Sequence, residues 1–219
     1  ILAKELNVSS KDILAKCAKA VAAAVEGRLA YRSKVQINGG GGDLSVISVP
    51  ANLHLAAHQL RRADGDGAEL FLYEGARMNS GLIVRSDEVT RLLMFELDSP
   101  RQCILLMVRQ APADFRASRQ PPATAQLTDA PAYPGSSPLR FWRDHGARTA
   151  VEVSRSADGG DAILGFFRES LRSSGWVDAM PAAIGTLVFL KGRQVCCVSV
   201  KAGDATSSLI TVLHKTLGD

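Results

Sequence analysis

A proline-rich segment divides this chain of 219 residues into two parts. Six of its nine prolines lie in residues 111–140, and small and polar residues fill most of the space between them. Because proline lacks a backbone donor and restricts the residue before it, we expect this segment to lie outside helices and sheets. The sequence therefore predicts an extended linker over 111–140, joining one folded module over 31–110 to a second over 141–219.

The two flanks of the linker resemble each other. Each contains an apolar strand, a tight turn, an Arg-Gln pair and a second apolar strand with cysteine, over residues 91–108 and 186–200. An amphipathic helix pattern precedes each hairpin, and a β-type run precedes each helix. We predict an α+β fold of two small modules, each an antiparallel sheet covered by one helix, with a possible internal duplication that equates the strands of Phe95 and Phe189. The helices are expected at Pro50–Arg62 and Asp161–Ser173, and the preceding strands at Leu44–Val49 and Thr149–Val153.

Residues 1–30 form a different part of the sequence. Apolar side chains from Ile13 to Leu29 follow helical spacing, which predicts an N-terminal helical segment. The opening stretch Ile1-Leu-Ala-Lys-Glu-Leu-Asn-Val-Ser-Ser-Lys-Asp-Ile-Leu-Ala-Lys16 resembles the small helical module at the front of bacterial translation initiation factor two. Past Lys16 the sequence departs from that pattern. The resemblance implies an accessory contact with a partner rather than GTP chemistry.

Composition and cysteine spacing exclude several classes of protein. Apolar residues make up 46% and charged residues 22%, which is typical of a globular protein and not of a disordered one. No apolar run approaches the roughly 18–20 residues that span a bilayer. The four cysteines, at positions 17, 103, 196 and 197, match no zinc or thioredoxin spacing, and we expect them to pack as small hydrophobic residues. A bridge from Cys103 to Cys196 or Cys197 is the alternative.

Motifs for catalysis or for metal binding are weak throughout the sequence. The run Gly39–Gly42 lacks the Gly-Lys-Ser or Gly-Lys-Thr ending of a phosphate-binding loop, so we interpret it as a flexible turn. His54 and His58 have the helical spacing of a metal pair, but no third ligand is indicated and we expect both to face solvent. We therefore predict a protein that is not an enzyme, with no catalytic residue, no cofactor, no metal and no small-molecule substrate that can be identified.

Basic residues occur in small groups, and the net charge is +4. A protein that binds single strands would interleave aromatic rings with cations across a sheet face, whereas the strands here are mostly Leu, Val, Cys and Met. We do not expect nucleic acid as a partner. The groups considered are Arg61-Arg62, the set Arg140, Arg143 and Arg148, and the pair Arg168/Arg172.

These observations favour a function in binding. We predict a protein-interaction or assembly component of a bacterial cell envelope or secretion-type complex, located in the periplasm or envelope. Phe166–Leu171 followed by Ser174-Gly-Trp176 is similar to small bacterial exported domains. The alternative is a cytosolic nucleic-acid or translation accessory protein, which unpaired cysteines and the initiation-factor-like start would favour.

The expected partner is another protein or a second copy of this chain. Because the first residue is Ile1 and not Met, we expect that earlier residues have been removed, and that any membrane contact runs through that missing N-terminal segment. Aromatic side chains are the residues most suited to a protein contact. The candidates are Phe115, Tyr133, Phe141, Trp142 and Trp176.

Overall fold

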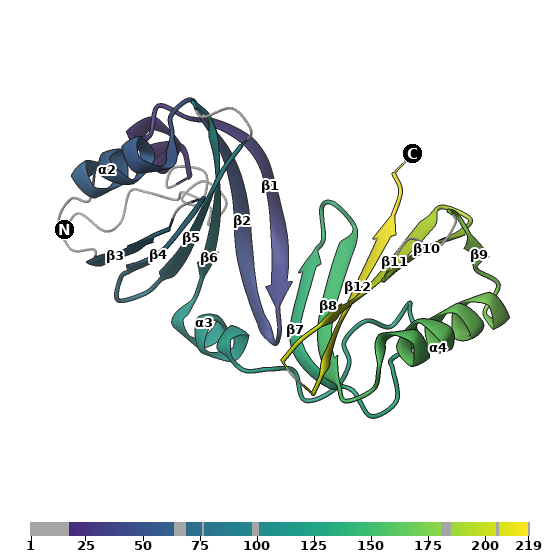
Figure 1. Ribbon diagram of the computed structural model, residues 1–219. Helices are drawn as coiled ribbons and strands as arrows, with labels where there is room; N and C mark the ends of the chain where they lie inside the picture. The colour runs from purple at the N-terminus through teal and green to yellow at the C-terminus, as the bar shows by residue number, and fades with distance from the viewer. Residues whose placement is uncertain are drawn as a thin grey trace, which may run out of the picture. The chain divides into compact units, whose positions relative to one another are not determined.

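The computed structural model describes residues 18–63, 69–75, 77–97, 101–180, 185–204 and 206–218. Residues 18–24 are helical. They are followed by β1 (Arg28–Ile37), β2 (Gly40–Val49), α2 (Leu53–Ala63), β3 (Glu69–Glu74), β4 (Met78–Val84), β5 (Val89–Glu96), β6 (Cys103–Gln110) and α3 (Pro112–Arg119) (Figure 1). The remaining elements are β7 (Ser137–Asp144), β8 (Thr149–Ser156), α4 (Gly160–Ser173), β9 (Val177–Asp178), β10 (Thr186–Lys191), β11 (Gln194–Ala202) and β12 (Ser208–Thr216).

Strands dominate the structure and form one hydrogen-bonded sheet in the order β3-β4-β5-β6-β2-β1-β7-β8-β12-β11-β10-β9. Strands and helices together confirm the predicted α+β class. The chain separates into two compact units: the first contains the described residues up to Ser33 and Gly42–Phe115, and the second contains Lys34–Gly41 and everything from Arg116 onwards. These boundaries differ from the predicted modules because the tip of the β1–β2 hairpin belongs to the second unit, where β1 pairs with β7.

The same order of elements occurs twice along the chain. Two strands, one helix and four further strands follow one another as β1 to β6 and again as β7 to β12, and each set has the same strand order in the sheet. The strand of Phe95 is the third after its helix, whereas the strand of Phe189 is the second, so the correspondence predicted from the Arg-Gln pairs is wrong. Shared strand order does not test common ancestry, and internal duplication stays a prediction.

The first unit has its core on one face of its strands. Helix α2 packs against β3, β4 and β5, and its apolar stripe Leu53, Ala56, Ala57 and Leu60 is buried, as the spacing predicted. Asn52 caps this helix, because its Oδ1 accepts the Leu55 N–H at 2.8 Å. Helical residues 18–24 contribute Ala18 and Ala22 to the same core. The predicted N-terminal segment is thus shorter than 1–30, since β1 already begins at Arg28; its residues 1–17 lie outside the described part of the chain.

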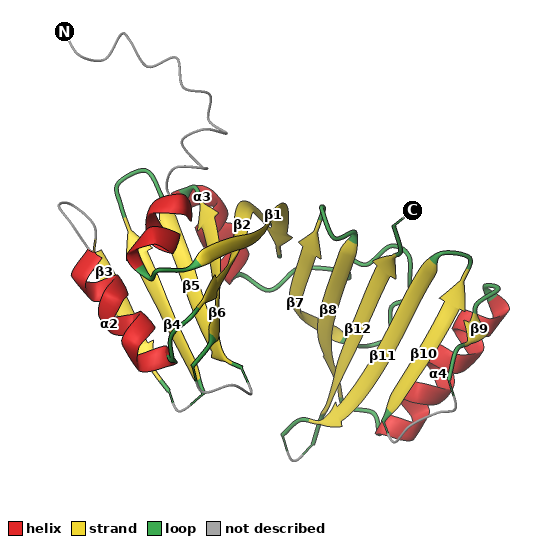
Figure 2. Cartoon of the chain, turned by 90° about the horizontal axis from the view of Figure 1, so that it is seen from above, coloured by secondary structure: helices red, strands yellow, loops and turns green. Residues whose placement is uncertain are grey.

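The second unit buries one face of its sheet in a similar way. Helix α4 packs against β9, β10 and β11 (Figure 2), with Ile163, Phe167 and Leu171 buried at helical spacing. Residues 127–133 join the same core beside the helix, since Leu127 is buried and Tyr133 packs its ring against Phe166 and Phe167.

The structure therefore corrects the linker prediction. Pro112 begins α3, which is the position in a helix where a missing N–H costs least. Further along, the buried Glu152 accepts hydrogen bonds from the backbone N–H groups of Gln126 and Leu127, at 2.6 and 3.1 Å. Residues 111–140 are thus a helix, a covering segment of the second unit and the start of β7, and not an extended tether.

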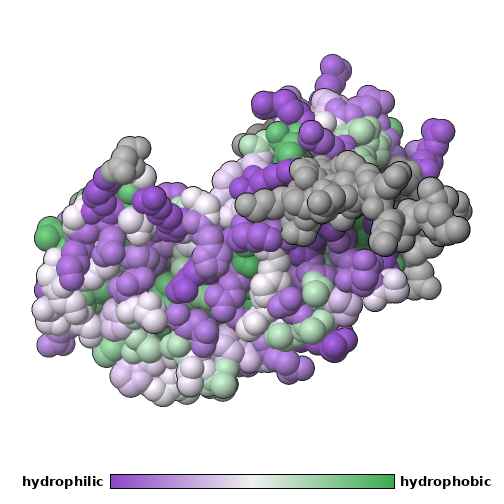
Figure 3. Space-filling view, turned by 180° about the vertical axis from the view of Figure 1, so that it is seen from behind, coloured by the Kyte–Doolittle hydropathy of each residue, from purple (hydrophilic) through white to green (hydrophobic). Residues whose placement is uncertain are grey.

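Hydrophobic side chains also reach the surface. Figure 3 shows patches of hydrophobic residues among hydrophilic ones on one side of the molecule. Within the described residues, no helix is both long enough and apolar enough to cross a membrane.

Candidate functional site

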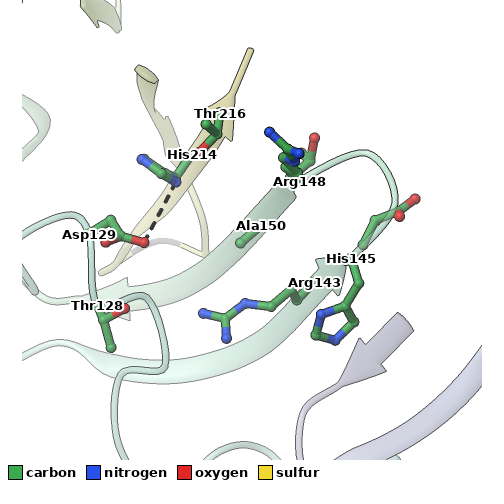
Figure 4. A pocket seen from close by; sticks show the side chains of 10 residues that line it. Thr128, Asp129, Arg143, His145, Arg148, Ala150, His214 and Thr216 are labelled. Atoms are coloured by element: carbon green, nitrogen blue, oxygen red, sulfur yellow. Dashed lines mark ion pairs between the residues drawn. The ribbon is translucent and has the colours of Figure 1, made fainter. Parts of the chain in front are cut away.

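A hollow of about 300 Å³ opens on the covered face of the second unit, beside the residues packed against α4. Its floor is set by strand register: Arg143 on β7 is the partner of Ala150 on β8, and Ala150 is the partner of His214 on β12 (Figure 4). Paired residues of antiparallel strands carry their side chains on the same face. The methyl group of Ala150 therefore lies between a guanidinium and an imidazole. Because this side chain is small, the space above it stays open as the hollow.

His214 forms one wall of the hollow. The residue is 5% exposed, its ring lies edge-on to Trp176 with 6.0 Å between ring centroids, and its Nδ1 is 3.9 Å from Asp129 Oδ2. Its Nε2 is buried without a hydrogen-bond partner. A buried nitrogen left without a partner costs free energy.

Arg143 forms the opposite wall. Its guanidinium lies over the Phe141 ring at 5.2 Å from the ring centroid, and Figure 4 shows it pointing toward Thr128 and Asp129. No hydrogen bond or ion pair ties this guanidinium to another side chain in the part of the chain that the structure describes. A guanidinium that rests on an aromatic ring keeps its donors free for a planar oxyanion.

The turn between β7 and β8 closes the rim with Arg148. Asp144 Oδ1 accepts the Ala147 N–H at 3.0 Å, and the Arg148 carbonyl accepts the Thr216 N–H at 3.0 Å. Arg148 has a φ of +49°, a conformation that non-glycine residues seldom adopt. The backbone at Arg148 is thus held in place by its neighbours, and its side chain lies on the rim of the hollow.

The aromatic residues predicted from sequence fall in different places. Phe141 and Trp176 are 1% and 5% exposed and belong to the core of the second unit. The Phe141 ring contacts the Arg143 guanidinium, and the Trp176 ring contacts the His214 ring. They are therefore core residues and not exposed contact residues. Trp142 is half-buried on the other face of the sheet, because successive strand residues alternate. Tyr133 is half-buried against α4, and its hydroxyl donates to Asp158 at 2.7 Å. Phe115 lies in the first unit against the Arg91 guanidinium, at 4.7 Å.

Sequence reasoning missed the hollow. Arg143 and Arg148 had been grouped with Arg140, but Arg140 pairs with Val153 and lies on the opposite face from Arg143. Asp129 and His214 are 85 residues apart and carried no motif. The register of three strands brings Arg143 and His214 together on either side of Ala150, and the segment before β7 adds Asp129.

The remaining predicted motifs are accounted for locally. His54 and His58 are exposed on α2, as expected, and no group of three His, Cys, Asp or Glu residues within the described chain could hold a metal ion. Only Gly39 of the glycine run lies in the turn, because β2 begins at Gly40. A Cβ on Gly42 would lie 2.9 Å from the Arg109 carbonyl oxygen, so close packing of strands requires glycine there.

The three described cysteines are free thiols, so neither alternative bridge from Cys103 is formed in this structure. Burial raises the pKa of Cys103 to about 11 and that of Cys196 to about 12, with smaller contributions from the charges of Glu96 and Cys197. Burial also raises the pKa of Cys197. Thiols with raised pKa values are poor nucleophiles at neutral pH.

Comparison with known proteins identifies no family for this chain. No family model and no curated protein matches the chain. Among solved structures, the crystal structure of MucB in complex with MucA(peri) matches at 11% identity over 95% of this chain and 94% of that one. The TM-score of 0.20 is too low to establish a shared fold.

Proposed function

We propose that this chain is a non-enzymatic protein-interaction or assembly component, and that it binds a different protein through an apolar sheet face of its first unit. The observation that carries the proposal is the face of β2, β4, β5 and β6 that points away from α2. We call it the open face. It consists of Val46, Met78, Leu82, Leu93, Phe95, Ile104 and Leu106.

Strand register places these side chains together. Leu93 is the partner of Leu106, Phe95 is the partner of both Ile104 and Met78, and paired residues share a face. The alternate residues of the same strands, such as Leu92 and Leu105, form the core beneath α2. The open face is therefore the second face of a sheet whose first face is already covered.

The open face is apolar without being buried. Met78 and Leu93 are 45% and 37% exposed, and none of its seven residues belongs to the core. Contiguous apolar surface on a folded protein marks an interaction site when charged residues surround it. Here Arg91 lies on the same face, two residues from Leu93, and contacts Phe115. Of the aromatic residues predicted for contact, Phe115 thus borders the open face.

The proposed partner is a different protein and not a second copy of this chain. A photoreactive amino acid at position 93 or 78, in cells that make the protein, should cross-link one partner repeatedly. The same residue at Leu190, which is 41% exposed on β10 of the second unit, serves as control and should not capture that partner. With the partner purified, Leu93→Glu should weaken affinity at least tenfold, and Leu190→Glu should leave it unchanged.

Two outcomes would overturn the proposal. The first is a homodimer by light scattering that Leu93→Glu dissociates, which would make the open face a contact between copies. The second is an affinity for the partner that Leu93→Glu and Met78→Glu leave unchanged.

We further propose a bacterial cell envelope or secretion-type complex as the setting, in the periplasm or envelope. The free thiols of Cys103, Cys196 and Cys197 favour the second candidate, a cytosolic translation or nucleic-acid accessory protein, because disulfides are rare in the cytosol. Fractionation of producing cells separates the two: recovery with periplasmic or membrane markers supports the envelope, and recovery with soluble cytosolic markers supports the alternative. An accessory contact through residues 1–16, as the initiation-factor resemblance implies, is part of that alternative.

A further inference from the structure

The hollow over Ala150 lies in the second unit, while the open face belongs to the first unit. We propose that the hollow binds a small organic anion, whose oxyanion group, phosphate or carboxylate, is held by Arg143 and Arg148. The lining offers hydroxyl, carboxylate, imidazole and guanidinium groups, of which the guanidinium groups are suited to bind an oxyanion.

The Arg143 guanidinium has hydrogen-bond donors available in the hollow. It is half-buried, it rests on the Phe141 ring, and within the described residues no acceptor on the protein takes its donors. Guanidinium groups bind carboxylate and phosphate through two parallel hydrogen bonds, and such charge-assisted bonds are about twice as strong as neutral ones. An oxyanion over Ala150 would satisfy donors that the fold leaves open.

Arg148 supplies a second cation from another direction. Its guanidinium and that of Arg143 flank Ala150 in Figure 4, one from the β7–β8 turn and one from β7. The φ of +49° at Arg148 is maintained by the hydrogen bonds of the turn, and conformations of this kind are concentrated at functional sites. The turn therefore orients the second arginine at a cost in backbone strain.

His214 lines the same hollow from β12. The residue is 5% exposed, and its Nδ1 is 3.9 Å from Asp129 Oδ2. Two guanidinium groups without a hydrogen-bonded acceptor among the described residues thus border the same space as a buried imidazole.

Size and charge narrow the class of ligand. A volume of about 300 Å³ is at the lower end for small-molecule pockets, so the ligand is small. Asp129, which is half exposed, and Asp144 stand on the same lining, and their charges disfavour a polyanion. A ligand with one oxyanion head near the arginines and a hydrogen-bond donor toward Asp129 fits this arrangement, as a hydroxy acid or a phosphomonoester does.

The test uses the full chain and three probes at equal ionic strength: inorganic phosphate, acetate and chloride. Titrations followed by ¹H–¹⁵N NMR should show saturable shifts of the Ala150 amide and of the Arg143 side-chain Nε–H with phosphate, acetate or both, and none with chloride. A response to phosphate alone assigns a phosphoryl ligand, and a response to acetate alone assigns a carboxylate ligand. Shifts that chloride reproduces, or no saturable shift with any probe, would overturn the proposal.

Variants separate a built site from general surface charge. Arg143→Gln and Arg148→Gln should each weaken binding about tenfold or more, which matches the loss of a charge-assisted hydrogen bond. Arg140→Gln is the matched control, since Arg140 lies on the same strand but on the opposite face. Ala150→Leu keeps every charge and fills the hollow, so it should abolish binding. If the Ala150→Leu variant binds as well as the wild type, or if Arg140→Gln weakens binding as much as Arg143→Gln, the site is not this hollow.

Discussion

Asn38 and Phe141, 103 residues apart in the sequence, exchange two hydrogen bonds within the second unit. The Asn38 backbone N–H donates to the Phe141 carbonyl at 2.9 Å, and the Phe141 N–H donates to Asn38 Oδ1 at 2.8 Å. The Asn38 side-chain amide also donates to the carbonyls of Ser118 and Gln120, at 2.8 and 2.7 Å. One buried side chain thus ties the tip of the β1–β2 hairpin to β7 and to the chain that leaves α3.

The first prediction concerns this residue. Asn38→Ala removes three hydrogen bonds and leaves buried partners unsatisfied, so the free energy of unfolding should fall by roughly 3 kcal/mol or more. Asn38 has a φ of +51°, a conformation that is unfavourable for alanine, so Asn38→Ala adds backbone strain to the loss of hydrogen bonds. Asn38→Gly keeps the backbone preference and removes only the side chain, so it isolates the hydrogen bonds. Urea denaturation gives both values, and a loss below about 1 kcal/mol in Asn38→Gly would contradict the assigned role.

The second prediction concerns Glu152 and the segment it holds. Glu152 is 7% exposed, and its Oε2 accepts both the Gln126 and the Leu127 N–H. Glu152→Ala removes the one oxygen that accepts both hydrogen bonds, so residues 120–135 should detach from the sheet more often. Chymotrypsin cleavage at Leu127 and Tyr133, followed by mass spectrometry, should be several-fold faster than in the wild type. Glu169→Ala, an exposed carboxylate on α4, is the control. Equal cleavage rates in all three proteins would mean that Glu152 does not hold the segment.

Helical periodicity was the most informative signal in the sequence. Helices α2 and α4 were predicted closely because each buries a stripe at spacings of three and four residues, such as Leu53, Ala56 and Leu60. Strand β1 was missed although Leu29, Tyr31, Val35 and Ile37 alternate with more polar residues, because Leu29 also continues the helical spacing that begins at Ile13. Strand β9 has two residues and gives no pattern at all.

The proline-rich segment shows why composition misled. Prolines restrict the backbone, but restriction is compatible with the first turn of a helix, as at Pro112, and with an irregular strand, as at Pro138, where the β7–β8 register shifts. Two of its apolar residues, Leu127 and Tyr133, pack against the core of the second unit, which α4 already covers in part. Composition shows that prolines restrict the backbone, but it does not show that a few apolar residues will pack against an existing core.

The candidate site could not be predicted for a related reason. Arg143, Ala150 and His214 lie on three strands, and β12 reaches β8 only after α4 and three other strands have intervened in the sequence. Which residues become neighbours depends on register, which one sequence without periodic motifs does not specify.

The third prediction concerns acid stability and the ion pair of Glu88 with Arg109. Burial by itself would raise the pKa of Glu88, but the hydrogen bond and charge of Arg109, with a further hydrogen bond from Thr90, lower the pKa below its ordinary 4.5. The Arg109 Nε donates to Glu88 Oε2 at 2.7 Å. A carboxyl group with a lowered pKa in the folded state stabilises the protein above its unfolded pKa, and this stabilisation is lost as pH falls through the folded value.

Glu88→Gln should therefore reduce the free energy of unfolding most at neutral pH, and the difference from the wild type should shrink below about pH 4.5. Denaturation curves between pH 3 and 7 measure both proteins. Asp87→Asn changes the exposed neighbouring carboxylate and should leave the pH profile unchanged. A difference between wild type and Glu88→Gln that stays constant over this range would show that the pair does not depend on ionisation.

The last prediction concerns alkaline stability and the buried thiols. Because burial raises the pKa of Cys103 to about 11 and of Cys196 to about 12, the folded chain keeps protons that the unfolded chain releases above pH 9.0. The unfolded state then binds fewer protons, so the free energy of unfolding must fall as pH rises above 9, by at most about 1.4 kcal/mol per pH unit for each thiol. Cys103→Ala and Cys196→Ala each leave a small cavity, which lowers stability by an amount independent of pH. The informative quantity is therefore the slope between pH 9 and 10.5, which should be shallower in each variant than in the wild type and shallowest in the double variant. Cys197→Ala, at a half-buried position, should change the slope less than Cys196→Ala. If all slopes are equal, the thiols ionise alike in both states and are not buried in the folded protein.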